Sequence, residues 1–155
     1  MEGGGQGNGR RVPTSPLPAE LRELLAKANP AVIATVRADG SPVTVATWYV
    51  LDGDRILVNM DARRKRLDHL RKDPRVSLTV TDADNWYTHV SLQGRVTELS
   101  DDADLSGIDR LSTHYGGNPY PDREHARVNA WIEIERWHGW GGAKGVAESA
   151  GQEPQ

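Results

Sequence analysis

The sequence gathers cationic side chains where a buried strand gives way to a helix. Seven lysines and arginines lie within the thirteen positions from Arg63 to Arg75 together with two aspartates, so this stretch carries +5. The whole chain carries −3, which leaves −8 on the remainder. A basic cluster on an acidic body favours a small anionic group held at one place, because a nucleic-acid binder would be basic more generally. The other interpretation is a solvated helix face.

The junction between this strand and helix has the composition of a phosphate site. Asp61 is a good N-cap candidate, and the amides of a first helical turn point outward with partial positive charge, which suits phosphate. Arginine donates paired hydrogen bonds to phosphate oxygens, and lysine adds a mobile charge. Cations at a helix N-terminus oppose the macrodipole unless an anion is bound. We therefore predict a phosphate clamp in which cationic side chains surround the first turn: Arg63, Arg64, Lys65 and Arg66.

Composition excludes several other kinds of site. The chain has 155 residues and no cysteine, so it suits one domain without disulfides, thiolate metal sites or a thiol nucleophile. Its five histidines show no metal-ligand spacing, and we predict neither a metal site nor a catalytic side chain. No apolar run reaches the roughly 20 residues that cross a bilayer, and the N-terminus lacks a signal-peptide core. We expect a cytoplasmic protein without membrane or nucleic-acid partners.

Glycine-rich and polar ends flank the predicted domain. Residues 1–15 and 141–155 are expected to be flexible tails, and residues 16–140 to form one cofactor-binding domain. Within it we predict helices in 16–28, at the basic stretch and in 101–114. Turns at Asp39-Gly40 and Asp52-Gly53-Asp54 make two successive hairpins, so the sheet is antiparallel. Six strands are predicted, over residues 31–37, 42–51, 55–59, 76–81, 86–99 and 127–137. Six antiparallel strands with few helices predict a mainly β fold, a small β-barrel with flanking helices.

Two details of the long strands bear on packing. Gly94 interrupts the inward row of the fifth strand, which predicts a bulge or bend. Alternation along the sixth strand places Trp131 and Trp137 on its outward row. An outward tryptophan pair predicts either packing beneath a neighbouring helix or burial in a dimer interface.

Four segments in a fixed order carry a family resemblance that covers about Leu17 to Gly139. They are AVIATVRADGSPVTVATWYV, NMDARRKRLDHLRKDPRVSLTV, LQGRVTEL and ERWHGW. Together they resemble the split β-barrel flavin and deazaflavin oxidoreductases related to pyridoxamine 5'-phosphate oxidase. The resemblance implies a six-stranded antiparallel split β-barrel of the PNP-oxidase-like, FMN-binding type. It also implies a homodimer with two cofactor grooves at its interface.

The resemblance also implies a cofactor and its contacts. The LRKDPR segment is most similar to members that use the deazaflavin coenzyme F420, while close relatives use FMN. The phosphate would be held by Arg64, Lys65 and Arg66, and its approach lined by Asn59, Met60 and Asp61. The tricyclic ring would lie over Ala46, Thr47 and Trp48, and Trp86 of the partner subunit would cover it.

The resemblance implies that the chain transfers a hydride between coenzyme F420 and a small conjugated or quinone-like substrate. Hydride transfer belongs to the cofactor, so no catalytic triad is expected. Alternatives are an FMN-dependent reductase, a non-catalytic flavin carrier, and a haem-binding carrier in which His69 would be the only histidine of the clamp. Oxidation of pyridoxamine phosphate is not expected, because the closing residues WHGWGGAKGVAESAGQEPQ lack that enzyme's arginine and histidine pattern.

Overall fold

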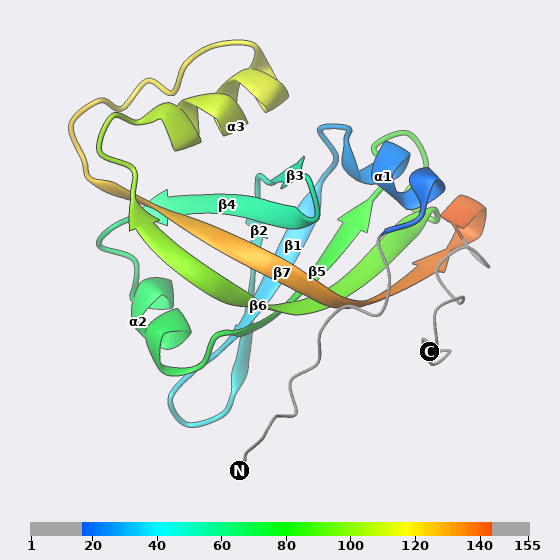
Figure 1. Ribbon diagram of the computed structural model, residues 1–155, viewed down its shortest axis with the longest axis horizontal. Helices are drawn as coiled ribbons and strands as arrows, with labels where there is room; N and C mark the ends of the chain where they lie inside the picture. Colours follow the sequence, from blue (N-terminus) through cyan, green and yellow to red (C-terminus); the bar gives the residue numbers. More distant parts are fainter. Residues whose placement is uncertain (1–16, 144–155) are drawn as a thin grey trace.

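The computed structural model describes residues 17–143 (Figure 1). Its helices are α1 (Ala19–Leu25), α2 (Lys65–Lys72), α3 (Ser106–Gly116) and the 3-10 turn η2 (Gly141–Ala143). Its strands are β1 (Ala31–Val36), β2 (Pro42–Thr47), β3 (Val50–Asp52), β4 (Arg55–Asp61), β5 (Arg75–Thr81), β6 (His89–Asp101) and β7 (Arg127–Trp140). The predicted tails lie outside the described residues, apart from Gly141–Ala143. No helix in 17–143 is long and apolar enough to span a membrane.

All the strands belong to one antiparallel sheet in the order β2-β1-β5-β6-β7-β4-β3. Its two edge strands, β2 and β3, are neighbours in the chain, with only Trp48 and Tyr49 between them. A sheet whose opposite edges are joined by two residues must curl back on itself, and the curvature of the long strands is visible in Figure 1. The edges do not pair, so the barrel is split. The predicted mainly β, split-barrel fold is confirmed.

Residues 17–143 contain seven strands where six were predicted, because the predicted strand over 42–51 is broken at Trp48 and Tyr49. The Tyr49 side chain is fully buried, and its hydroxyl donates to the Lys27 carbonyl at 3.2 Å. Its backbone N–H donates to the Tyr115 hydroxyl at 3.3 Å instead of joining a strand ladder. These contacts break the strand. Because the partners are distant in the sequence, the alternation of apolar and polar residues along the strand could not predict the break.

Strand β4 is buried on both faces, which explains its continuous apolar run. Ile56, Val58 and Met60 point into the barrel core. Leu57 points outward beneath α3, where it packs with Val50, Ile108 and Leu111. Helix α3 thus packs on the outside of β4 and β7, and it lies above β4 in Figure 1.

A bulge at Gly94 confirms the predicted irregularity and reverses the expected position of one tryptophan. Gln93 pairs with Arg136 and Gly94 with Ile134, so Glu135 is an extra residue in β7. The shift turns Trp137 into the barrel core, where it is 2% exposed; its predicted outward position was wrong. Trp131 is outward and packs beneath α3, as one of the two interpretations predicted. Neither tryptophan needs a second subunit for its burial.

Candidate functional site

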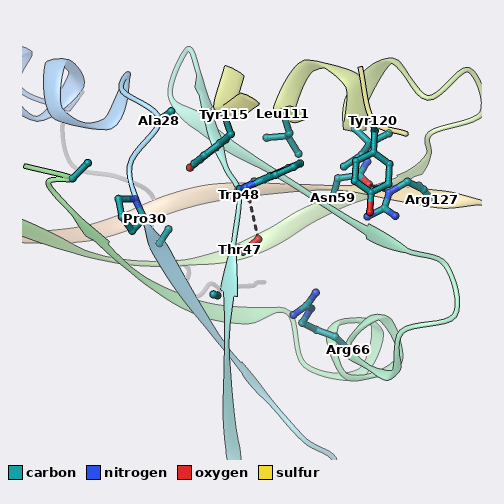
Figure 2. A pocket seen from close by; sticks show the side chains of 14 residues that line it. Ala28, Pro30, Thr47, Trp48, Asn59, Arg66, Leu111, Tyr115, Tyr120 and Arg127 are labelled. Atoms are coloured by element: carbon teal, nitrogen blue, oxygen red, sulfur yellow. Dashed lines mark hydrogen bonds between the residues drawn. The ribbon is translucent and has the colours of Figure 1, made fainter. Parts of the chain in front are cut away.

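A cleft of about 580 Å³ opens between the start of β1, the end of β2, helix α3 and helix α2 (Figure 2). This volume lies within the range of small-molecule and cofactor sites. Its lining combines small, aliphatic, aromatic, amide and cationic side chains. Its lining residues are Ala28, Pro30, Ala31, Ala46, Thr47, Trp48, Asn59, Arg66, Ala83, Ile108, Leu111, Tyr115, Tyr120 and Arg127.

Three rings form an aromatic wall along one side of the cleft: Trp48, Tyr115 and Tyr120. Trp48 stacks on Tyr115 with ring centroids 5.4 Å apart and 14° between planes, and it meets Tyr120 edge-on at 6.2 Å. The Tyr115 hydroxyl donates to the Asn29 carbonyl at 2.7 Å, which fixes the ring. Burial raises the pKa of Tyr115 to about 12, so this hydroxyl is a neutral donor at physiological pH. The near-parallel rings of Trp48 and Tyr115 are preformed and suit a planar conjugated ligand.

Across the cleft, Arg66 projects from the first turn of α2 toward the space beside Thr47 (Figure 2). Its Nε is buried without a hydrogen-bond partner, and within residues 17–143 it pairs with no carboxylate. Burial, and secondly the charge of Arg64, lowers the pKa of the Arg66 guanidinium from its ordinary value. The group remains a cation at neutral pH. A half-buried cation without a counter-ion is costly unless a ligand supplies the negative charge.

The carboxylate of Asp61 does not cap α2, contrary to the prediction. It accepts the Arg63 backbone N–H at 2.8 Å and binds the Arg63 guanidinium through two hydrogen bonds of 2.9 and 2.7 Å. These bonds hold the pKa of Asp61 well below its usual range. The helix begins at Lys65, with Arg64 at the N-cap position and no side-chain cap. Arg63 is therefore neutralised, while in the described chain Arg64, Lys65 and Arg66 have no ion pair.

A second arginine, Arg127 at the start of β7, lines the cleft near α3. Its Nε donates to Asn59 Oδ1 at 2.7 Å, and its guanidinium lies over the Tyr120 ring, 4.8 Å from the centroid. Asn59 Nδ2 in turn donates to Asp102 Oδ2 at 3.0 Å. The Asp102 carboxylate also accepts the backbone N–H groups of Gly107 and Ile108 at 2.8 Å each, so it anchors α3.

Comparison with known proteins assigns this architecture. The family model described as pyridoxamine 5'-phosphate oxidase matches residues 17–141, most of the chain. The chain belongs to the pyridoxamine 5'-phosphate oxidase family. No curated protein matches the sequence.

Solved structures of the same fold include proteins with different descriptions. One described as an F420 reductase is 26% identical, with a TM-score of 0.71, over 78% of this chain and 98% of its own. A conserved hypothetical protein of Mycobacterium tuberculosis is 28% identical, with a TM-score of 0.65, over 86% of this chain and 89% of its own. General stress protein 26 of Bacillus anthracis, 16% identical with a TM-score of 0.57 over 78% and 94% of the chains, shows the fold alone. At the family level these findings support a flavin- or deazaflavin-type oxidoreductase.

In this member of the family, five of the ten predicted site residues line the cleft: Ala46, Thr47, Trp48, Asn59 and Arg66. The Met60 side chain lies in the barrel core, so only its backbone is left for the role predicted for it. Arg64 and Lys65 are exposed beside Arg66, outside the lining. Trp86 precedes β6 in a turn, is 66% exposed and stacks on Tyr87 with centroids 4.6 Å apart. It lies outside the cleft of its own chain.

The wall's two tyrosines and the second arginine were not among the predicted site residues. Tyr115 and Tyr120 belong to the segment YGGNPYPD, which follows the predicted helix over 101–114. Two tyrosines in a short polar loop were a usable signal. Arg127 had no such signal, because its role depends on Asn59 in another strand. Tyr49, next to Trp48, is buried and does not line the cleft.

Proposed function

We propose that this protein is a cytoplasmic oxidoreductase that transfers a hydride between coenzyme F420 and a small conjugated or quinone-like substrate. One observation carries the proposal: a preformed aromatic wall at Trp48 and Tyr115 faces a half-buried Arg66 that has no counter-ion in the described chain. A cofactor with a flat ring system and a phosphate matches both features. The family assignment and the neighbour described as an F420 reductase support the same choice.

The residues present fit such a cofactor on the evidence of the buried, unpartnered Arg66 Nε. Arg66 would bind the phosphate, with Arg64 and Lys65 adding exposed charge beside it. Ala46, Thr47 and Trp48 would line the ring, and Asn59 the approach, with Met60 and Asp61 taking part through their backbone. When bound, the deazaflavin supplies the hydride; the chain's residues orient the ring and exclude water from one of its faces. No side chain is assigned a proton-transfer role.

We further propose that the active form is a homodimer with a cofactor groove at its interface. Val32 on β1 and Val45 on edge strand β2 are 43% and 40% exposed, and Trp86 and Tyr87 form an exposed aromatic pair. A second copy would cover these apolar side chains, and its Trp86 would reach over the ring. An unpaired edge strand is otherwise open to non-specific pairing.

FMN is the alternative cofactor, because it offers the same combination of ring and phosphate. A carrier without turnover uses the same cleft, so only reactivity distinguishes it from a reductase. A haem carrier would need an axial ligand, and none of the residues that line the cleft is a histidine. His69 lies on α2 outside the lining.

The proposal is tested by titrating the purified apo-protein with coenzyme F420 and, separately, with FMN, while tryptophan fluorescence is recorded. We expect saturable quenching by coenzyme F420 at lower concentration than by FMN. Reduced coenzyme F420 should then be oxidised in the presence of at least one member of a panel of quinones and enones. Tighter binding of FMN would make the chain a flavin protein. Binding without oxidation by any panel member would favour a carrier.

A further inference from the structure

The arginines of the described chain are either exposed or half-buried. Five are half-buried, and three of these form an ion pair with a carboxylate: Arg22 with Asp54, Arg55 with Glu98 and Arg95 with Glu135. The other two, Arg66 and Arg127, have no carboxylate partner within residues 17–143, and both line the cleft. The proposed function uses Arg66 for a phosphate and leaves Arg127 without a role.

Arg127 is held in place without being neutralised. Its one side-chain hydrogen bond in the described chain is donated by Nε to the neutral amide oxygen of Asn59, and Tyr120 supports one face of the guanidinium. The two terminal nitrogens therefore retain their N–H donors. Such a fork is preorganised for two parallel hydrogen bonds to one planar anion.

The orientation of Asn59 follows from its other partners. Asp102 is an acceptor when ionised, so the Asn59 amide must turn its Nδ2 toward Asp102 and its Oδ1 toward Arg127. Asp102 is itself fixed by the Gly107 and Ile108 amides at the start of α3. A second bond from Asn59 Nδ2 to Asn129 Oδ1, at 2.7 Å, completes the arrangement. The Asp102 carboxylate thus binds the backbone N–H groups at the start of α3 and the Asn59 amide. In this arrangement Arg127 contacts only the neutral amide of Asn59 and is not neutralised by Asp102.

We propose that Arg127 is a second anion-binding residue of the cleft, separate from the phosphate clamp, and that it receives a carboxylate group of a ligand bound in the cleft beside Tyr120. The proposal rests on the proposed function for the nature of that ligand. The carboxylate belongs either to a conjugated substrate or to the acidic tail of coenzyme F420. In the first case, the enzyme selects acidic substrates over neutral analogues.

The test uses the full chain and a matched pair of probes, anthraquinone-2-carboxylate and its neutral carboxamide, with binding measured by calorimetry. For a substrate site, we expect the carboxylate to bind at least about tenfold more tightly than the amide in the wild type, and Arg127→Gln to remove this preference. Arg127→Lys keeps the charge but loses the fork, so it should retain part of the preference. The control Arg136→Gln removes an exposed arginine from the same strand and should retain the full preference for the carboxylate probe.

A second set of titrations identifies the source of the carboxylate. If the group belongs to the coenzyme, Arg127→Gln weakens coenzyme F420 about tenfold but leaves FMN unchanged, because FMN carries a phosphate and no carboxylate. The proposal is overturned if Arg127→Gln, folded as judged by circular dichroism, alters neither the probe preference nor the affinity for coenzyme F420. It is overturned equally if Arg136→Gln has the same effect. The probe measurement does not need a bound coenzyme, so it remains decisive even if neither coenzyme binds the wild type.

Discussion

Trp48 and Tyr115 stack at the point where the barrel fails to close, with ring centroids 5.4 Å apart. Trp48 lies between the two edge strands of the sheet, and Tyr115 lies in the last turn of α3. The split in the barrel is thus also where the aromatic wall of the cleft is built. A closed barrel would pair this backbone in a ladder and leave no opening for a planar ligand.

The hydroxyl of Tyr115 stabilises the wall, and Tyr115→Phe isolates its contribution. The variant keeps the ring but loses the bonds to the Asn29 carbonyl and from the Tyr49 N–H. We expect the free energy of unfolding to fall by about 1–2 kcal/mol, because a buried carbonyl is left without its donor. Chemical denaturation measures this loss. Cofactor affinity should change less than threefold, and a larger change would mean that the hydroxyl contacts the ligand.

The same tyrosine predicts a dependence of stability on alkaline pH. Burial raises the pKa of Tyr115 to about 12, above its ordinary value of 10, so the folded state holds the proton more tightly than the unfolded state. This contribution to stability is fully present below pH 10 and is lost as the pH rises toward 12. Tyr115→Phe should therefore lose less stability than the wild type between pH 9 and 11.5, measured by urea unfolding at each pH. Parallel curves for the two proteins would contradict the assignment.

Gly94 is required by the close approach of β6 and β7. A Cβ at this position would lie 1.9 Å from the Glu133 carbonyl oxygen, which is backbone and cannot rotate away. Gly94→Ala should lower the free energy of unfolding by about 1–3 kcal/mol or more, measured by denaturation. Gly116→Ala is the control, since a Cβ added there would have no neighbour within 4 Å and alanine favours the helix. Equal stability of the two variants would show that the strands separate at little cost.

Trp86 tests the proposed dimer. It is 66% exposed in the single chain, so Trp86→Ala should leave the fold intact while weakening both dimerisation and cofactor binding. Sedimentation velocity over a range of concentrations reports the first effect, and fluorescence titration the second. Trp86→Phe keeps an aromatic ring and should retain most of both. If Trp86→Ala dimerises and binds as the wild type does, the predicted role of this residue is wrong.

The element order and the location of the cleft were predictable because they depend on local patterns. Alternation and turn residues identified the hairpins, and the density of arginines identified the junction where Arg66 enters the cleft. Long-range contacts decided the rest. Asp61 was a reasonable cap, but Arg63, two residues later, takes its carboxylate. The extra residue Glu135 reverses the faces of β7, so alternation alone placed Trp137 on the wrong side.

The second arginine illustrates what a single sequence does not record. Arg127 lies 68 residues from Asn59, and the two meet only because β4 and β7 pair in one register. The register depends on the whole sheet, and the depth of the cleft depends on how α3 packs over β4. These features arise from tertiary packing, which leaves no periodicity in the residues concerned.

The clamp on α2 is the central claim, and the dissociation constant of coenzyme F420 for variants of this one helix tests it most directly. Arg66→Ala should weaken binding by about 1.5–3 kcal/mol, or roughly 10- to 150-fold, because it removes the half-buried cation of the clamp. The double variant Arg64→Ala/Lys65→Ala should have a smaller effect, since both side chains are exposed.

The control is Arg71→Ala, on the same helix, which removes an exposed arginine paired with Asp68. It should bind as the wild type does. A graded loss in the order Arg66, then Arg64 with Lys65, then Arg71, with unchanged thermal stability, is the predicted result. Unchanged affinity in folded Arg66→Ala, or an equal loss in Arg71→Ala, would contradict the clamp.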